Sequence, residues 1–458
     1  MISKRITRAG TCPARVFSRF GGATAAIMLA VAPLPAFAAS PAIAAGGAAQ
    51  LSNSIGGAGV SDFYRARGDR PLWLAPQSAG AAQAMLGLLN SASVDGLNPE
   101  RYQVRRIAGA LRAAQRGDAR AVNRAERMLS EAFVAYARDL RRAPNLGIVY
   151  VDHELRPAPP SARTLLDGAA AAPSLRAYVE DMGWMNPSYG QLRRALLARS
   201  YAEEAQRRTL TLNLERARAL PAGSGRYVVV NAAAQRLFMY ENGEVVDNMR
   251  VVVGKPRHAT PMMTALIRYA ALNPYWNVPT DLALERIVPN VLKGGTSYLR
   301  AHGYQVLSDW SDHPRVVDPG SVDWKAVAAG STQVRLRQLP GSGNAMGRMK
   351  FMFPNQEGIY LHDTPEKELL TEAARLFSGG CIRLEDAPRL GRWLFGKPLR
   401  PQGASAEQTV PLPVPVPLYV TYLTAVPSGS SIAYFDDIYG RDAARLAQFG
   451  RNPPLASR

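Results

Sequence analysis

The spacing of apolar residues divides the chain into a first part with helical periodicity and a second part with strand periodicity. Residues 81–90 and 120–141 place apolar side chains three and four positions apart among arginines and glutamates, which is typical of amphipathic helices. This pattern dominates from about residue 62 to residue 220. We therefore expect an all-helical domain with arginine-rich solvated faces over residues 61–222.

After the glycine-rich stretch at 221–225 the period becomes that of β-strands. The expected strands are 226–231, 236–240, 245–253, 267–272, 334–338, 350–353, 358–361 and 410–422. Asn242-Gly243 is a strong signal for a hairpin turn between the second and third of them. Prolines alternate from 411 to 417, which favours an edge strand or an extended arm.

The expected helices of this second part are 364–376 and 385–394. The segment from 281 to about 324 looks helical and irregular, and Gly294-Gly295 interrupts it. We predict an inserted helical cap over about 282–335. The fold class is thus α+β and multidomain: the helical scaffold domain, a mixed β-rich domain over 223–425 that carries the cap, and a C-terminal extension over 426–458.

The first 38 residues have the parts of a secretory signal peptide. Five basic residues and no acidic residue fall in the first 19, an apolar stretch follows at 21–34, and Ala36-Phe37-Ala38 matches a cleavage signature. Two prolines and the short length argue against a membrane span, although an uncleaved anchor is the alternative reading. We expect cleavage after Ala38, a flexible lead-in over 39–60 and a secreted destination.

The charge balance indicates an anionic partner. The 458 residues include 55 Lys and Arg against 36 Asp and Glu, so the formal net charge is +19. Nucleic acid, a membrane or an acidic polymer could each attract such a protein. Because the chain is predicted to be secreted, no nucleic acid partner is expected.

The chain has two cysteines, Cys12 and Cys381. Cys12 would leave with the signal peptide, so Cys381 would remain as one thiol without a disulfide partner in an oxidising compartment. Such a thiol is either buried and inert or kept because it reacts.

The sequence around Cys381 favours a reactive thiol. A predicted strand ends at His362, 19 positions before Cys381, and the loop Ser378-Gly379-Gly380 leads into the cysteine. A strand–helix–loop return could set imidazole and thiol side by side as base and nucleophile. A buried structural cysteine beside a core histidine is the alternative.

Two further features of this loop fit a nucleophile. The amides of Gly379, Gly380 and Cys381 could converge as an oxyanion hole, because glycine permits unusual backbone angles. A helix beginning near Cys381 would favour the thiolate through its N-terminal dipole.

These residues resemble the signature of the L,D-transpeptidases, the YkuD-like family, in which a histidine and a spacer precede Ser/Thr-His/Gly-Gly-Cys. Here the motif reads His362, a spacer, then Ser378 to Arg383. The similarity continues at 273–279 and through the block from 337 to 355. Segments at 63–74, 96–99 and 213–216 resemble the helical scaffold of the large Gram-negative type, which also has a capping subdomain.

The resemblance implies a periplasmic enzyme that acts on peptidoglycan stem peptides without metal or cofactor. Cys381 would attack the carbonyl between diaminopimelate at position three and D-Ala at position four of a tetrapeptide donor. The side-chain amine of a second diaminopimelate, the acceptor, would resolve the thioester and give a 3→3 cross-link. His362 would be the base, and the Asp363 carbonyl would orient its ring. Tyr360 and Trp276 would line the donor site, and Ser378 and Arg383 would position substrate.

Two departures from the family pattern matter. Gly379 stands where many relatives have histidine, which leaves His362 as the base. Too few residues lie between Tyr201 and Asn213 for a small peptidoglycan-binding domain. Wall affinity would then rest on the scaffold and on the basic surface, which could also meet the anionic membrane.

The other histidines lack zinc-site spacing. Water or a protein lysine as acceptor, and a non-catalytic wall-binding scaffold, remain alternatives.

Overall fold

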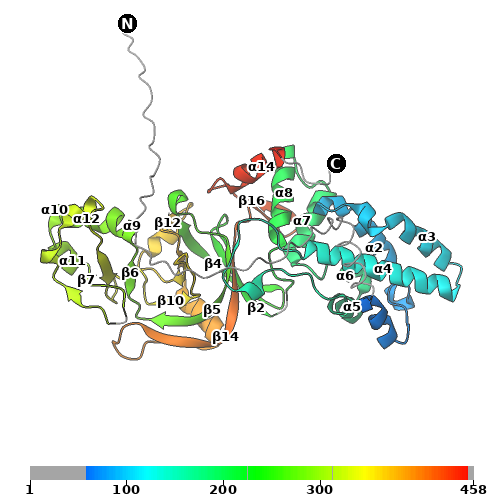
Figure 1. Ribbon diagram of the computed structural model, residues 1–458, viewed down its shortest axis with the longest axis horizontal. Coiled ribbons are helices and arrows are strands. Elements are labelled where there is room, and N and C mark those ends of the chain that lie inside the picture. Colours follow the sequence, from blue (N-terminus) through cyan, green and yellow to red (C-terminus); the bar gives the residue numbers. More distant parts are fainter. Residues whose placement is uncertain (1–57, 224, 312, 452–458) are drawn as a thin grey trace, which may run out of the picture. The chain divides into compact units, whose positions relative to one another are not determined.

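The computed structural model describes residues 58–223, 225–311 and 313–451 (Figure 1). The predicted signal peptide over 1–38 and residues 39–57 of the predicted lead-in lie outside the described residues. Within the described part of the chain, no helix is long and apolar enough to cross a membrane.

The first described part is built from packed helices. Their bounds are α2 Ala81–Asn90, α3 Val104–Ala114, α4 Ala119–Leu140, α5 Ala162–Ala171, α6 Leu175–Glu180, α7 Pro187–Leu197 and α8 Glu204–Ala217. The two helices expected at 81–90 and 120–141 are confirmed as α2 and α4. Asp118 caps α4 by accepting a hydrogen bond from the Ala121 amide, which satisfies one of the free donors at a helix start.

Buried carboxylates hold these helices to the segments that join them. Glu126 of α4 is 1% exposed and accepts hydrogen bonds from the amides of Leu72, Trp73 and Leu74 at 2.8, 3.1 and 2.6 Å. The Tyr64 hydroxyl donates to the same carboxylate at 2.7 Å. One side chain of α4 therefore fixes the chain entering α2, because a buried amide needs an acceptor.

The β-rich part is a sheet that closes on itself. The strands on the closed path are β5 Met263–Leu272, β10 Met349–Met352, β11 Leu361–His362, β13 Ile382–Leu384, β4 Glu244–Gly254, β3 Arg236–Glu241, β2 Arg226–Asn231 and β14 Gln408–Thr421. Closure comes from β14, which pairs with β2 in parallel and with β5 antiparallel. β1 Val149–Tyr150 and β12 Leu376–Ser378 add to β5 and β4.

The expected turn between β3 and β4 is confirmed. Asn242 and Gly243 have φ values of 52° and 89°, the left-handed angles that a tight hairpin requires.

The expectation of an edge strand at 410–422 is correct for one half only. Residues 408–411 and 416–417 pair with β5 alone among the described strands, with an irregularity between Pro411 and Val416, whereas 418–420 lie between β2 and β5.

The insertion is not purely helical, which corrects the predicted helical cap. It contains the sheet β6 Trp276–Val278, β9 Arg335–Gln338, β7 Tyr304–Leu307 and β8 Val316–Val317. Its helices are α9 Thr280–Leu282, a π-helix Ala283–Ile287, α10 Val288–Gly294, α11 Ser297–Ala301 and α12 Trp324–Ala328. β9 matches the strand expected at 334–338, whereas β6, β7 and β8 are two to four residues long, too short for an alternating pattern to stand out in the sequence.

The helix expected at 364–376 is also wrong. The segment forms one 3₁₀ turn, Lys367–Leu370, and then strand β12, whose neighbour Arg375 accepts a hydrogen bond from the Val253 amide at 2.9 Å. Pairing with β4 thus replaces helical hydrogen bonds. The next helix, α13 Ala387–Phe395, begins after β13. Cys381 is therefore followed directly by a strand, and the expected helix dipole at the thiol is absent.

The C-terminal residues return to the scaffold helices. They form the hairpin β15 Ala425–Ser428 and β16 Ser431–Tyr434, then helix α14 Arg441–Arg451. Asn213 of α8 accepts from the Thr424 amide at 2.9 Å and donates to its hydroxyl at 2.8 Å. Arg216 of α8 forms an ion pair with Asp442 at 2.6 Å. The 213–216 segment thus joins α8 to the C-terminal extension.

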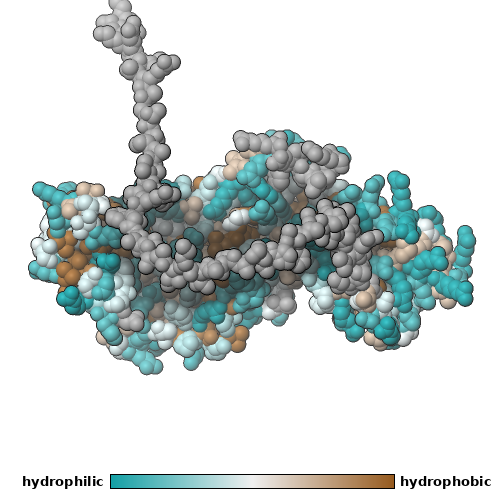
Figure 2. Space-filling view, in the orientation of Figure 1, coloured by the Kyte–Doolittle hydropathy of each residue, from teal (hydrophilic) through white to brown (hydrophobic). Residues whose placement is uncertain are grey.

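The described surface differs between its parts. Figure 2 shows mainly hydrophilic residues over the scaffold helices and a hydrophobic area over the cap. Exposed apolar side chains of the cap are Leu292, Trp310 and Val316. Arg105, Arg106 and Arg112 of α3 and Arg120 and Arg124 of α4 are exposed, as the solvated faces predicted for these helices require.

Candidate active site

Strand pairing brings the two halves of the histidine–cysteine motif together. β11 and β13 run parallel, with Leu361 opposite Ile382 and His362 opposite Arg383. The Ile382 amide donates to the Tyr360 carbonyl at 3.1 Å, so Cys381 lies beside Tyr360 at the start of β13. Residues two apart on a strand share a face. Continued by one residue, this register sets Cys381 opposite Tyr360, with His362 two positions further along on the same face of the neighbouring strand.

The imidazole of His362 is held in one orientation. It is 2% exposed, and its Nδ1 lies 2.6 Å from the Asp363 carbonyl oxygen. A carbonyl accepts only, so Nδ1 carries the proton and Nε2 presents its lone pair. Burial and then the charge of Arg383 lower the pKa of His362 to about 3. The ring is neutral at physiological pH and thus able to accept a proton.

The thiol of Cys381 is half-buried and also neutral. It donates to the Gly358 carbonyl at 3.5 Å, and the Tyr360 side chain hydrogen-bonds to it. Burial raises the pKa of Cys381 to about 11, although the hydrogen bond from Tyr360 and the charges of Arg383 and Lys350 oppose that shift. The free protein thus holds a thiol and an imidazole rather than an ion pair.

Two hydroxyl groups, one in the loop and one from Thr260, hold the loop before Cys381. Ser378, 2% exposed, donates from Oγ to the Cys381 carbonyl at 2.6 Å and accepts from the Gly380 amide at 3.1 Å. The Thr260 hydroxyl donates to the Gly380 carbonyl at 2.8 Å. The Gly380 amide is therefore already used, which corrects its predicted place in the oxyanion hole. Of the three predicted donors, the amides of Gly379 and Cys381 are left for that role.

Both glycines of the loop are needed for separate reasons. Gly380 has a φ of 115°, which L side chains rarely adopt. A Cβ on Gly379 would lie 2.8 Å from a terminal methyl carbon of Leu282 in α9. The absence of a side chain at 379 thus allows the cap to pack directly against the loop that precedes Cys381.

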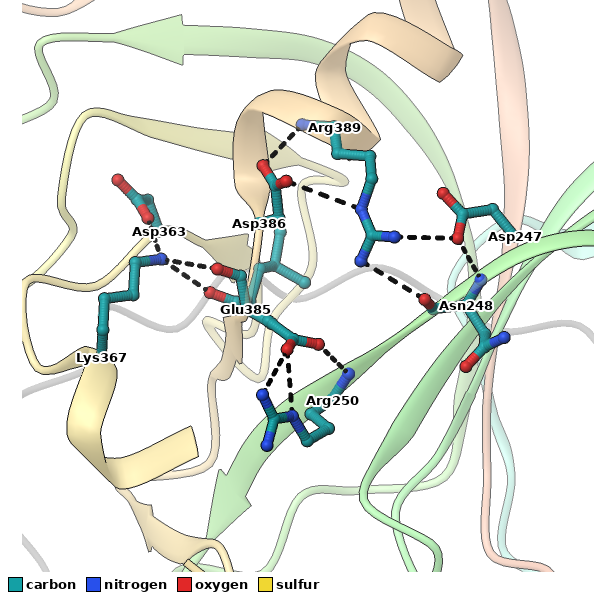
Figure 3. A network of polar contacts seen from close by, with 9 residues as sticks. Asp247, Asn248, Arg250, Asp363, Lys367, Glu385, Asp386 and Arg389 are labelled. Atoms are coloured by element: carbon teal, nitrogen blue, oxygen red, sulfur yellow. Dashed lines mark hydrogen bonds and ion pairs between the residues drawn. The ribbon is translucent and has the colours of Figure 1, made fainter. Parts of the chain in front are cut away.

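A network of polar contacts supports the Asp363 backbone (Figure 3). The Asp363 carboxylate accepts from Lys367 Nζ at 2.7 Å and from the Arg348 amide at 3.0 Å. Lys367 Nζ also donates to the Leu384 and Glu385 carbonyls, which follow Cys381 along β13. The network fixes the carbonyl that holds His362 and ties it to the cysteine strand.

The close packing of the Asp363 carboxylate against residue 347 requires a glycine at that position. Gly347 has a φ of 61°, and a Cβ there would lie 2.5 Å from a carboxylate oxygen of Asp363. Arg250, on the other side of the network, donates to Glu385 from its amide, Nε and Nη2 at 2.8, 3.0 and 2.6 Å.

Two buried cations flank the imidazole on the neighbouring strands. Lys350 of β10 lies opposite His362 in the register and forms an ion pair with Glu407 at 2.6 Å. Arg383 lies opposite His362 on the other side and forms an ion pair with Glu366. Lys350 was not predicted from the sequence, because its role depends on pairing between strands. The carboxylate partner of Arg383 within the chain was not predicted either.

The other predicted site residues contact the cap. Tyr360 packs against both the barrel core and the cap core, and its ring centroid is 5.9 Å from that of His362. Trp276 begins β6 and is 6% exposed within the cap core. The Ser378 hydroxyl is used inside the catalytic loop.

His258 lies on the loop after β4, where its ring faces Asp281 and Glu285 of the cap at 3.7 and 3.4 Å. Lys255 and Arg257 also pair with Glu285. This histidine therefore joins the cap to the barrel. Among the described residues no group of three or more His, Cys, Asp or Glu is arranged to hold a metal ion.

Comparisons with known proteins identify both parts of the chain. Residues 225–397 match the model of the YkuD family, the L,D-transpeptidase catalytic domain, and residues 58–196 match that of a scaffold domain. The chain is 30% identical over 240 residues to the Haemophilus influenzae protein named "Putative L,D-transpeptidase". That alignment covers 51% of this chain and 48% of the relative, so the chain spans about half the length of the curated relative it matches.

Solved structures show a weaker likeness. An L,D-transpeptidase from Mycobacterium smegmatis aligns at a TM-score of 0.22 and 18% identity, over 43% of this chain and 59% of that one. An LD transpeptidase in complex with imipenem aligns at 0.21 and 15% identity, over 43% and 60%. The family matches are adjacent in the sequence: the region similar to the YkuD L,D-transpeptidase catalytic domain, residues 225–397, follows the region similar to the scaffold domain, residues 58–196.

Proposed function

We propose that this protein is a periplasmic L,D-transpeptidase that forms 3→3 cross-links in peptidoglycan through a thioester on Cys381. The observation that carries the proposal is the β11–β13 register, which gives a neutral imidazole and a thiol a common face beside a glycine loop. The family match of residues 225–397 supports the reaction class.

Acylation would begin with the proton of Cys381 Sγ. His362 Nε2 takes that proton as the sulfur attacks the carbonyl carbon between diaminopimelate and D-Ala of a tetrapeptide stem. The carbonyl oxygen becomes an oxyanion and is stabilised by the Gly379 and Cys381 amides; one such donor typically contributes about 3–4 kcal/mol. The C–N bond then breaks, and D-Ala leaves with the proton from the imidazolium. The thioester remains on Cys381.

The second half-reaction would reverse these roles. The side-chain amine of a diaminopimelate on a second stem attacks the thioester, and His362 accepts the proton that the amine loses. The C–S bond breaks, the sulfur regains a proton from the imidazolium, and a 3→3 amide is formed.

The charged residues around the pair fit this sequence. Lys350 and Arg383 stabilise negative charge that develops on sulfur and oppose a resting imidazolium. Their partners Glu407 and Glu366 are on the chain itself, so a stem-peptide carboxylate would compete with Glu366 for Arg383. Trp276 and Tyr360 would border the donor peptide where cap and barrel meet.

Location and partners belong to the same proposal. The predicted signal peptide supports export to the periplasm, where stem peptides are found. The net charge is +19 for the whole sequence, or 19 − 5 = +14 without the five basic residues of the predicted signal peptide, and supports association with the anionic wall or membrane surface.

The decisive experiment incubates the purified protein with disaccharide-tetrapeptide and separates the products by liquid chromatography and mass spectrometry. Release of D-Ala with formation of 3→3 dimers, both lost in Cys381→Ala, is the expected result. Tripeptide monomers alone would indicate water as acceptor and reject transpeptidation. No D-Ala release would reject the enzyme and leave a wall-binding scaffold.

A further inference from the structure

A pocket of about 510 Å³ lies beside helix α14, and none of the residues assigned to the active site lines it. Its walls come from α8, from α14, from the loop 145–147 and from Pro261-Met262 before β5. Three of its lining residues are arginines: Arg216, Arg441 and Arg445. The pocket is thus strongly basic for its size.

The arginines are only partly neutralised by the chain. Arg216 Nη1 pairs with Asp442 at 2.6 Å, and Arg445 Nη2 pairs with Glu215 at 3.0 Å. Arg441 Nη2 donates to a backbone oxygen, the Thr260 carbonyl, at 2.8 Å.

The other acidic group near Arg441 is already engaged. The Asp437 carboxylate accepts hydrogen bonds from the Tyr422 hydroxyl at 2.8 Å and from the Asp442 and Ala443 amides at 3.0 Å each. Burial and the charge of Arg216 lower the pKa of Arg441, although Tyr439, Tyr422 and Asp437 oppose the shift. An added anion would offset the electrostatic repulsion between the Arg216 and Arg441 guanidinium groups.

Two arginines that line this pocket each have a buried N–H group without an acceptor among the described residues. Arg216 is 3% exposed, and its buried Nε makes no hydrogen bond there. Nη1 of Arg441 is buried and equally unpaired. A buried charged donor left unpaired is costly, so a ligand that accepts hydrogen bonds from these N–H groups would be stabilised by them.

We propose that the pocket binds an oxyanion, a phosphate or carboxylate group, between Arg216 and Arg441. Guanidinium N–H groups recognise both through charge-assisted hydrogen bonds. The tyrosine rings of 422 and 439 lie 5.0 Å from the Arg441 guanidinium and hold it in place, so little side-chain entropy is lost on binding. This site is separate from the transpeptidase reaction and does not depend on it.

Neighbouring alanines on α14 provide a matched pair of test variants. Ala444 is exposed and lines the pocket, whereas Ala443 is exposed and does not line it. In Ala444→Glu, a carboxylate tethered at the pocket stands in for the ligand. Ala443→Glu adds the same charge to the same helical turn, outside the lining.

The experiment measures Tm of the full chain in sodium phosphate and in sodium acetate against sodium chloride at equal ionic strength. We expect phosphate, acetate or both to raise Tm of the unchanged protein and of Ala443→Glu, by about 2 °C at ten times Kd. Ala444→Glu should lose this response. The oxyanion that acts identifies the ligand as phosphate or carboxylate. The proposal would be overturned if neither oxyanion, in up to 50-fold excess over the protein, raised Tm relative to sodium chloride at equal ionic strength. An equal rise of Tm in Ala444→Glu would also overturn it.

Discussion

The protonation state of Cys381 gives a prediction that can be worked out in numbers. The thiol has a pKa of about 11, raised from 9.0 by burial, and His362 has a pKa of about 3. At pH 7 the thiolate fraction is then about 10⁻⁴, compared with about 10⁻² for a cysteine at 9.0. Because the thiolate is the species that reacts with alkylating agents, Cys381 should react about 100-fold more slowly than an ordinary cysteine.

The assay follows the rate of Cys381 alkylation by iodoacetamide between pH 6 and pH 10, read by intact-protein mass spectrometry. The rate should rise about tenfold per pH unit across the whole range, because the pH stays below the thiol pKa. His362 stays neutral throughout, so no inflection is expected near 6.5. Cys381→Ser provides the blank. A rate that is already on a plateau from pH 6 to pH 8 would refute the reasoning, since it would mean a resting thiolate–imidazolium pair.

The variant His362→Gln separates charge from base catalysis. Its alkylation profile should match that of the unchanged protein, because a neutral ring contributes no charge to the thiolate. Acylation by a carbapenem should fall about 10²–10⁴-fold, because the reaction loses its base. An equal fall in both rates would show that His362 activates the thiol in the free protein.

The remaining predictions concern two supporting contacts. Gly347→Ala should slow carbapenem acylation about 10–100-fold, because its Cβ would displace the Asp363 carboxylate, whereas Gly343→Ala, whose Cβ would meet nothing within 4 Å, should not. Equal rates in the two variants, measured by intact mass, would contradict the role given to the Asp363 network. Glu126→Ala should lower the free energy of unfolding in urea by about 3–5 kcal/mol, because it removes the acceptor of the Leu72, Trp73 and Leu74 amides. A loss below about 1 kcal/mol would mean that water replaces the carboxylate.

Elements with a strong local signal were predictable from the sequence. The strand at 226–231 has the predicted bounds, and the Asn242-Gly243 turn needs only two residues with positive φ. Helix α4 was predictable because its 22 residues repeat the apolar stripe several times. His362 and Cys381 were predicted from the sequence as a reactive pair, since a lone thiol after two glycines is unusual in a chain with a predicted signal peptide.

Elements fixed by distant partners were not predictable. The segment 364–376 contains helix-forming residues, but hydrogen bonds to β4 hold its end as a strand, and Lys367 is used to fix Asp363. The amide of Gly380 looked available until the Ser378 hydroxyl was placed beside it. Lys350 acquires its role only because β10 lies next to β11. Local spacing contains no information about such neighbours.

The most direct test of the account is the site of acylation. The purified chain is exposed to a carbapenem, and its intact mass and tryptic peptides are measured. We predict one covalent adduct on the peptide that contains Cys381, absent in Cys381→Ala and formed much more slowly in His362→Gln. An adduct that persists in Cys381→Ala, or an unchanged mass in the unsubstituted protein, would contradict the claim that this thiol is the nucleophile.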